Sequence, residues 1–363
     1  MTEIVIENVS KRIGGQLVLQ DIDLKIKSGD VAVILGPAGS GKTMLLKIIA
    51  GTEKPDKGRV YFDGKDVTDL PPQKRDVGMV FQNFALYPNM TIYDNIASPL
   101  RVKKISEREI QSRVNEIVSF LNIGTIVNKK PHECSGGEAQ RAAIARALVK
   151  RAKVYLFDQP LTNLDYKVRE SLRFELQRVF AELNTTVLYC TPNPEEAAAL
   201  GKTLVYLRKG RVVQQGSVKE CFAKPVDLNA ANAYSIVGVN VFDSKCVRHD
   251  DRKIMAINEC FQIDVTDLAE LDEGKNYKVA FYPHDVALFP VATERMLSIP
   301  VSVELIENMG SEQVVVTKCG DRFFTILASA VDNIHQLAAI NRVYIPLSRV
   351  MIFSEEGLYV RNV

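Results

Sequence analysis

A glycine-rich octapeptide that ends in lysine and threonine is the part of the sequence best suited to chemistry. It spans residues 36–43, reads GPAGSGKT, and fits the pattern G-x-x-x-x-G-K-[ST]. Glycines let backbone N–H groups curl around phosphate oxygens, and a helix N-terminus adds partial positive charge. Lys42 would reach the β- and γ-phosphates, and the Thr43 hydroxyl would ligate Mg²⁺. The octapeptide predicts a nucleotide site made by Gly36, Pro37, Ala38, Gly39, Ser40, Gly41, Lys42, Thr43 and Met44.

The residues on either side of this loop predict the elements that position it. Val31–Leu35 is a short apolar run typical of a buried strand, and Met44–Ala50 is an apolar helix. Strand, loop and helix in this order are the context in which the glycine pattern binds phosphate. The alternation of strands and helices from Val31 to Tyr206 favours a parallel sheet with crossover helices. We therefore expect an α/β core with further strands at Glu3–Val9, Leu17–Ile26, Lys153–Asp158 and Thr185–Thr191, and a hairpin at Arg59–Val67.

Length and composition narrow the class of protein. The 363 residues exceed one small core, so we expect at least two domains. A net charge of +2 gives no sign of a nucleic-acid surface. No apolar run approaches a membrane span, and the alternating first residues do not resemble a signal peptide. The six cysteines are scattered, which predicts reduced cytosolic thiols, and the four histidines lie too far apart in the sequence to predict a protein metal site.

The segment Val77–Ile96 resembles the Q-loop region of the ATP-binding subunits of ABC transporters, especially importers of the maltose and glycerol-phosphate kind. In that family the glutamine that matches Gln82 helps to hold Mg²⁺ and senses the γ-phosphate. The segment that follows, Asn83–Asn95, matches the surface on which a membrane subunit docks. From composition alone, the apolar and aromatic residues 84–88 would be assigned to a core. The resemblance instead implies a docking surface for two membrane-spanning permease subunits.

Residues 134–141, CSGGEAQR, resemble the family signature L-S-G-G-Q-x-Q-R, with cysteine in place of leucine and glutamate in place of the first glutamine. A serine and two glycines at the start of a helix form a second anion cradle, here Ser135, Gly136 and Gly137. In the family this cradle closes on the γ-phosphate held by the other subunit. The resemblance therefore implies that ATP is bound between two subunits.

Two acidic positions complete the resemblance, which covers essentially the whole chain. The apolar run Lys153–Asp158 ends at the Walker B position, where the carboxylate of Asp158 would hold Mg²⁺. Residues 161–165, LTNLD, match the D-loop, in which Asp165 would lie at the dimer interface. The expected metal ligands are Thr43, Gln82 and Asp158, and the expected cofactors are ATP and Mg²⁺.

The family resemblance and a change of pattern divide the chain into two expected domains. Residues 1–235 resemble an ABC ATP-binding domain with a RecA-like core and a helical subdomain at about 97–150. Residues 225–242 are typical of a linker, and residues 236–363 carry short alternating strands separated by turns, which predict a small β-barrel. The run Val301–Val316, centred on residues 306–312, is similar to the OB-like appendage of carbohydrate importer ATPases. The strands are expected at Lys278–Tyr282, Ile299–Leu305, Gln313–Lys318, Phe323–Leu327 and Val343–Pro346.

Three positions depart from the family. Gln159 stands where a glutamate normally polarises the attacking water, and Pro192 stands where a switch histidine normally follows the next strand. Ile13 takes the place of an aromatic residue that stacks on adenine. Each change alone has a simpler explanation, such as a substitution that traps ATP at Gln159 or a loose alignment at Ile13. Together, however, they affect only the nucleotide site that this chain's own P-loop builds.

The groups that would serve a partner's site, Ser135–Gly137 and Asp165, are retained. An amide cannot act as a general base, and losing such a base costs about 10²–10⁴ in rate. We therefore expect a chain that binds ATP, hydrolyses it slowly at its own site, and works as the degenerate half of a heterodimer rather than a homodimer.

The resemblance also implies cargo, partners and location. The expected class is an importer of carbohydrates or polyols, with glycerol favoured by similarity around Asn95–Leu100 and Tyr189–Ala197. An extracytoplasmic solute-binding protein would act indirectly, and the chain would lie at the cytoplasmic face of the bacterial inner membrane through its permeases. Two alternatives remain, a non-catalytic regulatory ABC protein and a soluble ABC ATPase that is not coupled to transport.

Overall fold

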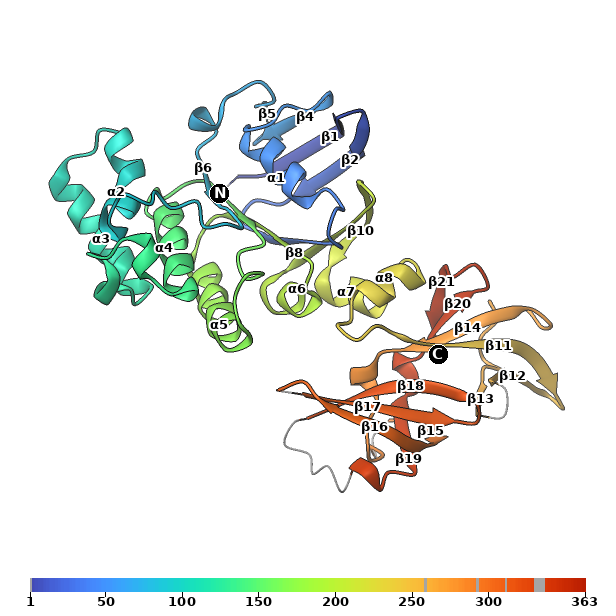
Figure 1. Ribbon diagram of the computed structural model, residues 1–363. Coiled ribbons are helices and arrows are strands. Elements are labelled where there is room, and N and C mark those ends of the chain that lie inside the picture. Colours follow the sequence, from blue (N-terminus) through green and yellow to red (C-terminus); the bar gives the residue numbers. More distant parts are fainter. Residues whose placement is uncertain (1, 258–259, 292–293, 311, 330–336) are drawn as a thin grey trace. The chain divides into compact units, whose positions relative to one another are not determined.

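The computed structural model describes residues 2–257, 260–291, 294–310, 312–329 and 337–363. These residues form two compact units, Met1–Val218 and Lys219–Val363. Within the described ranges, no helix combines the length and apolar character that crossing a bilayer requires. Each unit is described separately below (Figure 1).

The first unit is built around a mixed six-stranded sheet. Its order is β10-β9-β3-β8-β7-β6, and all neighbouring pairs are parallel except β9 with β10. Strands β3, β7 and β8 are buried at every position, as the apolar runs predicted. The bounds are β3 Val31–Leu35, β6 Val77–Val80, β7 Val154–Asp158, β8 Thr186–Thr191, β9 Thr203–Arg208 and β10 Arg211–Ser217.

The first unit also contains a second, antiparallel sheet, which shares one apolar core with the first sheet. Its order is β2-β1-β4-β5, and the turn between β4 and β5 contains Asp63 and Gly64, as expected for the hairpin. Helix α1 packs between the two sheets, because its buried side chains share one apolar core with residues of β1, β2, β3, β7 and β8. The bounds are β1 Ile4–Ile13, β2 Gln16–Ile26, α1 Lys42–Ala50, β4 Lys57–Phe62 and β5 Lys65–Asp66.

Helices α2 to α6 complete the first unit (Figure 1). The first four of them are capped at their N-termini by Thr91, Ser106, Ser135 and Asp165, whose side-chain oxygens accept a backbone N–H three residues later. The helical region therefore begins at Ile92, five residues before the expected start at 97. The bounds are α2 Ile92–Val102, α3 Glu107–Phe120, α4 Gly136–Leu148, α5 Tyr166–Glu182 and α6 Pro194–Leu200.

The second unit begins with two short helices and is otherwise all β, as expected. Its sheets have the orders β13-β12-β11-β14-β20-β21, β15-β19 and β16-β17-β18 and surround one apolar core. The bounds are α7 Val218–Ala223, α8 Leu228–Ala233, β11 Asn240–His249, β12 Arg252–Ile257, β13 Phe261–Asp264, β14 Asn276–Phe281, β15 Met296–Pro300, β16 Ser302–Asn308, β17 Glu312–Cys319, β18 Arg322–Ser329, β19 Arg342–Pro346, β20 Met351–Ser354 and β21 Tyr359–Asn362. Short 3₁₀ turns occur at Pro72–Lys74, Gly124–Ile126, Pro131–Glu133, Pro283–Asp285 and Leu347–Arg349.

Two expectations about this region were wrong. Residues 225–242 are not a linker, because they contain α8 and the start of β11. The α8 segment packs on the end of the chain, where the Leu228 N–H donates to the Gly357 carbonyl at 2.9 Å and the Tyr359 N–H donates to the Val226 carbonyl at 3.2 Å. These contacts assign α8 to the second unit, so the division between the units falls at Val218 and not near residue 235.

The run Ile299–Leu305, expected as one strand, is divided between two sheets. Residues up to Pro300 pair with β19, and residues from Ser302 pair with β17. Between them, the Val301 N–H donates to the Asn341 carbonyl. Ser311, at the centre of the run that resembles the OB-like appendage, lies outside the described residues.

Candidate functional site

The glycine-rich loop joins β3 to α1, and its glycines are required by close approach and by positive φ. A Cβ at Gly36 would lie 2.2 Å from the Leu207 carbonyl oxygen of β9. Gly39 and Gly41 adopt φ values of 75° and 103°, which side chains with a Cβ rarely adopt. The loop can therefore wrap tightly at the carboxyl end of β3, where the N-terminus of α1 opens toward any bound anion.

Lys42 lies inside this loop and not in solvent. Its ammonium donates to the carbonyls of Gly36 at 2.7 Å and Pro37 at 2.8 Å, and to the Ser40 hydroxyl at 3.4 Å. Burial lowers the pKa of Lys42. The ammonium is thus held by neutral oxygens at the centre of the loop, where negatively charged phosphate oxygens would be stronger acceptors.

The structure brings together Thr43, in the first turn of α1, and Asp158, at the end of β7. The Thr43 hydroxyl donates to the Asp158 carboxylate at 2.9 Å. Burial raises the pKa of Asp158, although the bond from Thr43 and the charge of Lys42 oppose the rise. One hydroxyl and one carboxylate suit Mg²⁺, which keeps several waters and takes its other ligands from the phosphates of a nucleotide. In the described ranges, no three His, Cys, Asp or Glu side chains are grouped as a protein-only metal site.

Gln82 is the third expected metal ligand. It follows β6, and its carbonyl accepts a 3.5 Å hydrogen bond from the Asn163 amide of the D-loop segment. Within the part of the chain that is described, no hydrogen bond joins the Gln82 side chain to Thr43 or Asp158. The structure therefore connects Gln82 to the D-loop segment, and its role toward Mg²⁺ remains a prediction.

Gln159 follows Asp158 directly in a left-handed conformation, with φ of 47°. Its backbone N–H donates to the Cys190 carbonyl of β8 at 3.0 Å, and its side chain hydrogen-bonds to Asp158, which lowers the pKa of that carboxyl. The amide is thus positioned at the end of β7 beside the candidate metal ligand. Pro192 is exposed just past the end of the neighbouring strand β8.

The residues around Pro192 form a buried network that the sequence analysis missed. The carboxylate of Glu196 is 4% exposed and accepts hydrogen bonds from the Tyr189 and Thr191 hydroxyls, both at 2.7 Å. Burial raises the pKa of Glu196. Asn193 caps α6 by accepting from the backbone N–H groups of Glu195 and Glu196. Asparagine followed by proline and two glutamates is a helix-start pattern that could have identified α6.

The signature segment forms a reciprocal cap at the start of α4. The Ser135 hydroxyl accepts the Glu138 N–H at 3.3 Å, and the Glu138 carboxylate accepts the Ser135 N–H at 2.8 Å. The bond from Ser135 holds the pKa of Glu138 below its usual range. Glutamate in place of the family glutamine therefore completes a capping box.

The signature segment and the D-loop segment lie against each other. A Cβ at Gly136 would lie 3.4 Å from Leu164, and one at Gly137 would lie 2.6 Å from Val168 of α5. Asp165 caps α5 by accepting the Val168 N–H at 3.0 Å. Two helix N-termini thus begin side by side. In the described residues, no hydrogen bond or ion pair connects Ser135 or Asp165 to the glycine-rich loop.

Ile13 ends β1 beside the turn of the first hairpin, where it pairs with Gln16. Its side chain is 50% exposed. An exposed aliphatic group offers apolar contact but no aromatic face for stacking. Its assignment to an adenine site stays a prediction.

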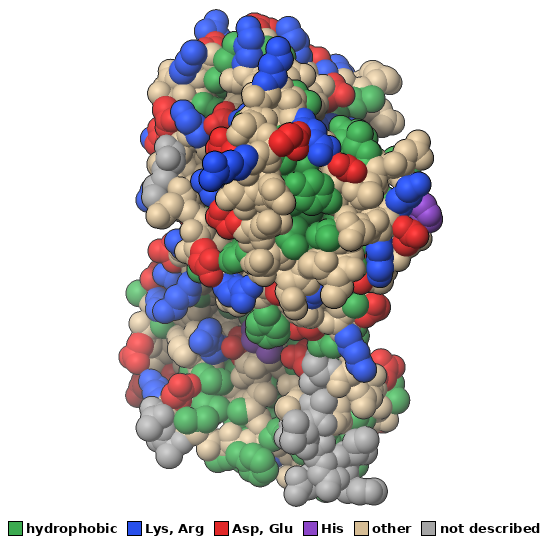
Figure 2. Space-filling view, turned by 90° about the vertical axis from the view of Figure 1, so that its left-hand side faces the viewer, with side chains coloured by type: hydrophobic (Ala, Val, Ile, Leu, Met, Phe, Trp, Pro, Cys, Tyr) green, Lys and Arg blue, Asp and Glu red, His purple; other side chains and the backbone are tan. Residues whose placement is uncertain are grey.

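The segment expected to bind a membrane subunit is held in place by Arg146 of α4. The Arg146 guanidinium donates to the carbonyls of Ala85 at 2.7 Å and Phe84 at 3.1 Å, and it lies over the Tyr87 ring. A cavity of about 460 Å³ lies beside this segment, lined by residues that include Met79, Phe81, Tyr87, Val102 and Lys150. Figure 2 shows that Lys and Arg are interspersed with Asp and Glu on the visible face of the first unit.

Comparisons with known proteins agree with this geometry. A family profile described as ABC transporter matches residues 19–162. The sn-glycerol-3-phosphate import ATP-binding protein UgpC of Bordetella avium is 35% identical over 90% of this chain and 88% of its own length. The trehalose/maltose import ATP-binding protein MalK of Thermococcus litoralis is 35% identical over 88% of this chain and 89% of its own. The spermidine/putrescine import ATP-binding protein PotA of Aggregatibacter actinomycetemcomitans is 36% identical over 78% of this chain and 76% of its own.

Solved structures agree with the sequence comparisons. A dimeric bacterial ABC transporter cassette is 34% identical, with a TM-score of 0.54, and covers 59% of this chain and 98% of that one. A dimeric post-hydrolysis state bound to ADP and Pi has the same identity, TM-score and coverage. The chain therefore belongs to the ATP-binding subunits of ABC transporters, a family of ATPases.

Proposed function

We propose that this chain is the ATP-binding subunit of an importer for a carbohydrate or polyol, with glycerol as the leading candidate. The relatives named for glycerol-3-phosphate and trehalose/maltose import match over 90% and 88% of the chain, so the match includes most of the second unit. The relative named for spermidine/putrescine import matches over 78%. The longer match favours a carbohydrate or polyol cargo over a polyamine.

The proposed partners are a second ATP-binding subunit and two permease subunits. The permeases would dock near Asn83–Asn95, where Arg146 fixes the backbone beside a cavity that can accept an inserted segment. A solute-binding protein outside the membrane would act through the permeases. This arrangement would place the chain at the cytoplasmic face of the bacterial inner membrane.

Mg-ATP would bind at the glycine-rich loop. Lys42 would exchange loop carbonyls for phosphate oxygens, and Thr43, Asp158 and Gln82 would hold Mg²⁺, which neutralises charge on the β- and γ-phosphates. Asp158 is buried, so it would act as a fixed carboxylate in a site of low polarity. Ile13 would contact the base without stacking on it.

The placement of Gln159 beside Asp158 carries the proposal that this site is slow. An amide at this position can orient water but cannot remove its proton, which lowers the rate by about 10²–10⁴. Pro192 offers no side-chain donor or acceptor where the family has histidine. Ser135 and Asp165 keep well-formed helix caps, so the partner's ATP would still meet an intact cradle. The chain would therefore be the slow half of a heterodimer.

The test is ATP turnover by the purified chain alone and together with its sister ATP-binding subunit. We expect little turnover alone, restoration by the sister, and loss of that restored turnover in the Ser135→Arg variant. Rapid turnover by the chain alone would show that Gln159 and Pro192 are compensated, and would refute the slow-site proposal.

A further inference from the structure

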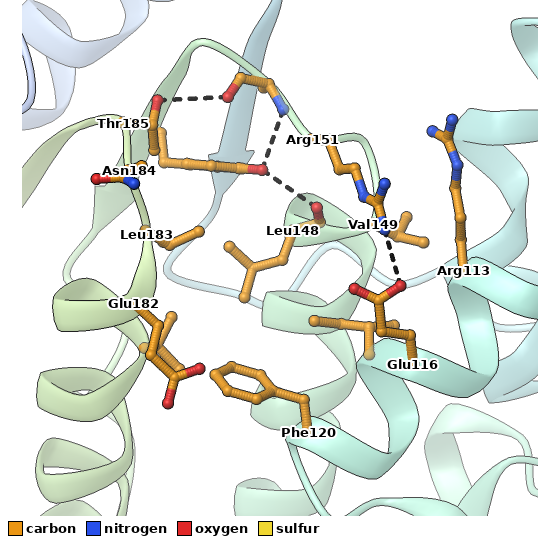
Figure 3. Close-up of a pocket in the computed structure, with 14 residues that line it drawn as sticks. Arg113, Glu116, Phe120, Leu148, Val149, Arg151, Glu182, Leu183, Asn184 and Thr185 are labelled. Carbon is orange, nitrogen blue, oxygen red and sulfur yellow. Dashed lines mark hydrogen bonds and ion pairs between the residues drawn. The ribbon is translucent and has the colours of Figure 1, made fainter. Parts of the chain in front are cut away.

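Polar side chains around one cavity of the first unit have ordinary partners. The cavity has a volume of about 410 Å³ and lies between α3 and the ends of α4 and α5, and Figure 3 shows the residues that line it. The Thr185 and Tyr155 hydroxyls donate to backbone carbonyls at 3.4 Å and 3.1 Å. The exposed side chains of Arg151 and Glu116 pair with each other at 2.8 Å. These four side chains are therefore satisfied, and their contacts suggest no chemistry.

Two thiols of the second unit, by contrast, meet each other. The Cys260 thiol donates to the Cys319 carbonyl at 2.8 Å, and it also hydrogen-bonds to the Cys319 thiol. Both side chains belong to the apolar core of this unit and are only 6% and 4% exposed. We name these two residues the thiol pair. The structure thus places two oxidisable sulfur atoms together, although the two cysteines are 59 residues apart in the sequence.

The other four cysteines have different surroundings. All six are free thiols. Cys134 and Cys190 donate to backbone carbonyls at 3.5 Å and 3.8 Å, and Cys221 and Cys246 are buried. Within the described residues, none of these four forms a hydrogen bond with a second thiol. A buried cysteine can be merely a small apolar residue. The contact between two thiols is what distinguishes the thiol pair from that case.

The thiol pair connects two different sheets. Cys260 directly precedes β13, and its N–H donates to the carbonyl of Ile257, the last residue of β12, at 3.1 Å. Cys319 ends β17, and Gly320 leads toward β18 with a φ of 56°. A Cβ at Gly320 would lie 3.4 Å from the Cys260 sulfur. The Cys260 side chain therefore packs directly on the turn between β17 and β18.

A cluster of aromatic rings holds the same two sheets together. The Phe242 ring of β11 packs edge-on against Phe261, which follows Cys260, with 5.4 Å between the ring centroids. It also packs against Phe324 of β18 at 5.8 Å, and Phe281 contacts both Phe242 and Phe324. Close-packed rings resist a change in the spacing of the elements that carry them. The two thiols are therefore kept close without a covalent bond.

We propose that Cys260 and Cys319 form a reversible redox site, at which a small hydroperoxide oxidises the two thiols to a disulfide that joins the two sheets. This inference does not depend on the proposed function. Hydrogen peroxide first transfers one oxygen to the Cys260 sulfur, which gives a sulfenic acid and one water. The Cys319 sulfur then bonds to the Cys260 sulfur, and the sulfenic hydroxyl leaves with the Cys319 proton as a second water. The two thiols lose two protons and two electrons, which reduce the O–O bond of the peroxide.

Burial determines the order of the steps and the kind of oxidant. Burial, together with the hydrogen bond and the charge of Cys260, raises the pKa of Cys319 to about 12. Because the thiolate is the form that reacts, Cys260 should be oxidised first. A bulky oxidant such as oxidised glutathione cannot align with a sulfur that is 6% exposed, whereas hydrogen peroxide is little larger than water. The reaction should be slower than that of an exposed thiol.

The test treats the purified full chain with hydrogen peroxide, blocks the remaining thiols and maps all cysteines by mass spectrometry. We expect a cross-linked peptide that contains Cys260 and Cys319, and dithiothreitol should restore both thiols. Oxidised glutathione should leave the thiol pair reduced over the same time. The midpoint of denaturant unfolding should rise on oxidation, because a cross-link removes conformations from the unfolded chain. Dithiothreitol should reverse that rise.

Cys260→Ala and Cys319→Ala should each abolish the cross-link and the rise in the midpoint. Cys246→Ala is the matched control, since Cys246 is 0% exposed in the same core, and it should keep both effects. The inference is overturned if both thiols stay free in peroxide, or if Cys260 is oxidised to a sulfinic acid while Cys319 remains a thiol. Cross-linking by oxidised glutathione as fast as by peroxide would refute the choice of a small oxidant. The mapping of the wild-type chain decides the inference even where an alanine variant fails to fold.

Discussion

The Thr43 hydroxyl and the Asp158 carboxylate, 115 residues apart in the sequence, are joined by a 2.9 Å hydrogen bond. Strand β8 lies between β3, which leads into the glycine-rich loop, and β7, which ends in Asp158. Parallel strands end at the same edge of the sheet, so both side chains meet there. This pair is the geometric basis for the proposed Mg²⁺ site.

Thr43→Val should weaken Mg²⁺ binding without disturbing the fold. The valine keeps the shape of threonine but removes the oxygen ligand, so the affinity for Mg-ATP should fall by at least about tenfold. The affinity for ATP measured in EDTA should not change. Thr52→Val is the control, because the Thr52 hydroxyl donates to the Lys47 carbonyl at an exposed position. Equal loss with and without Mg²⁺ would contradict the assignment.

Gln159→Glu combined with Pro192→His should activate the chain's own site. A carboxylate in place of the amide restores a general base, and turnover of the chain alone should rise by about 10²–10⁴. Single-turnover hydrolysis of bound ATP measures the chemical step directly. Gln177→Glu, on the exposed surface of α5, serves as the control for added charge. An inactive double variant would mean that another step or residue limits this site.

Ser135 has a structural role and a proposed binding role, and two substitutions separate them. Ser135→Ala removes the cap of α4 and should lower the free energy of unfolding by about 1 kcal/mol. Ser135→Asp keeps a good capping oxygen, so stability should hold while its negative charge repels the partner's γ-phosphate. ATP turnover by the dimer that this chain forms with its sister ATP-binding subunit should fall in both variants. The fall should be larger in the aspartate variant.

The matched control for Ser135 is Ser106, which caps α3 in the same way. Ser106→Ala should lower stability by a similar amount and leave turnover unchanged. Normal turnover with Ser135→Asp would remove Ser135 from the proposed site.

Arg75 stabilises the fold of the first unit, so its replacement should clearly lower the free energy of unfolding. The guanidinium is 4% exposed and donates to the carbonyls of Ile48, Ile49, Leu70 and Thr68 at 2.8–2.9 Å. Two of these carbonyls lie in the last turn of α1. Arg75→Met would leave buried acceptors without donors and should lower the free energy of unfolding by more than about 2 kcal/mol.

Denaturant unfolding measures the effect of Arg75→Met. The control is Arg59→Met, which breaks an exposed ion pair with Asp66 and should cost less than about 1 kcal/mol. Similar losses in the two variants would show that the Arg75 contacts are replaceable.

Glu196 should make stability depend on pH. Burial raises the pKa of its carboxyl in the folded state above the ordinary value of about 4.5. The folded state therefore binds the proton of the Glu196 carboxyl more tightly than the unfolded state does. Its contribution to stability is full below pH 4.5, and it declines as pH rises toward the raised folded pKa. The Tyr189 and Thr191 hydroxyls and the charges of Arg169 and Arg173 oppose the rise without cancelling it.

Glu196→Gln keeps an acceptor for both hydroxyls and cannot titrate, so it should remove this decline. Unfolding free energies measured from pH 4 to pH 8 test the difference, with the exposed Glu182→Gln as control. Parallel pH profiles for wild type and Glu196→Gln would contradict the role given to Glu196.

Local sequence was sufficient to predict most elements of the first unit. The run Val31–Leu35, the turn at Asp63 and Gly64, and the helix start at Ser135 each depend on neighbouring residues, so their patterns are visible without a partner. The helix α8 and the division of Ile299–Leu305 were missed, because neighbours distant in the sequence decide both. The spacing of apolar residues within one segment does not specify which strand it pairs with or where a helix packs.

The sequence by itself determined the family, the nucleotide loop and the substitutions Gln159 and Pro192, since these follow from residue type and spacing. Only the tertiary structure decided which distant groups meet. The order of the sheet placed Asp158 beside Thr43, and the packing of α1 gave Arg75 its carbonyl partners. The physical reason is that burial and hydrogen bonding depend on the three-dimensional neighbours of a residue, which chain order does not specify.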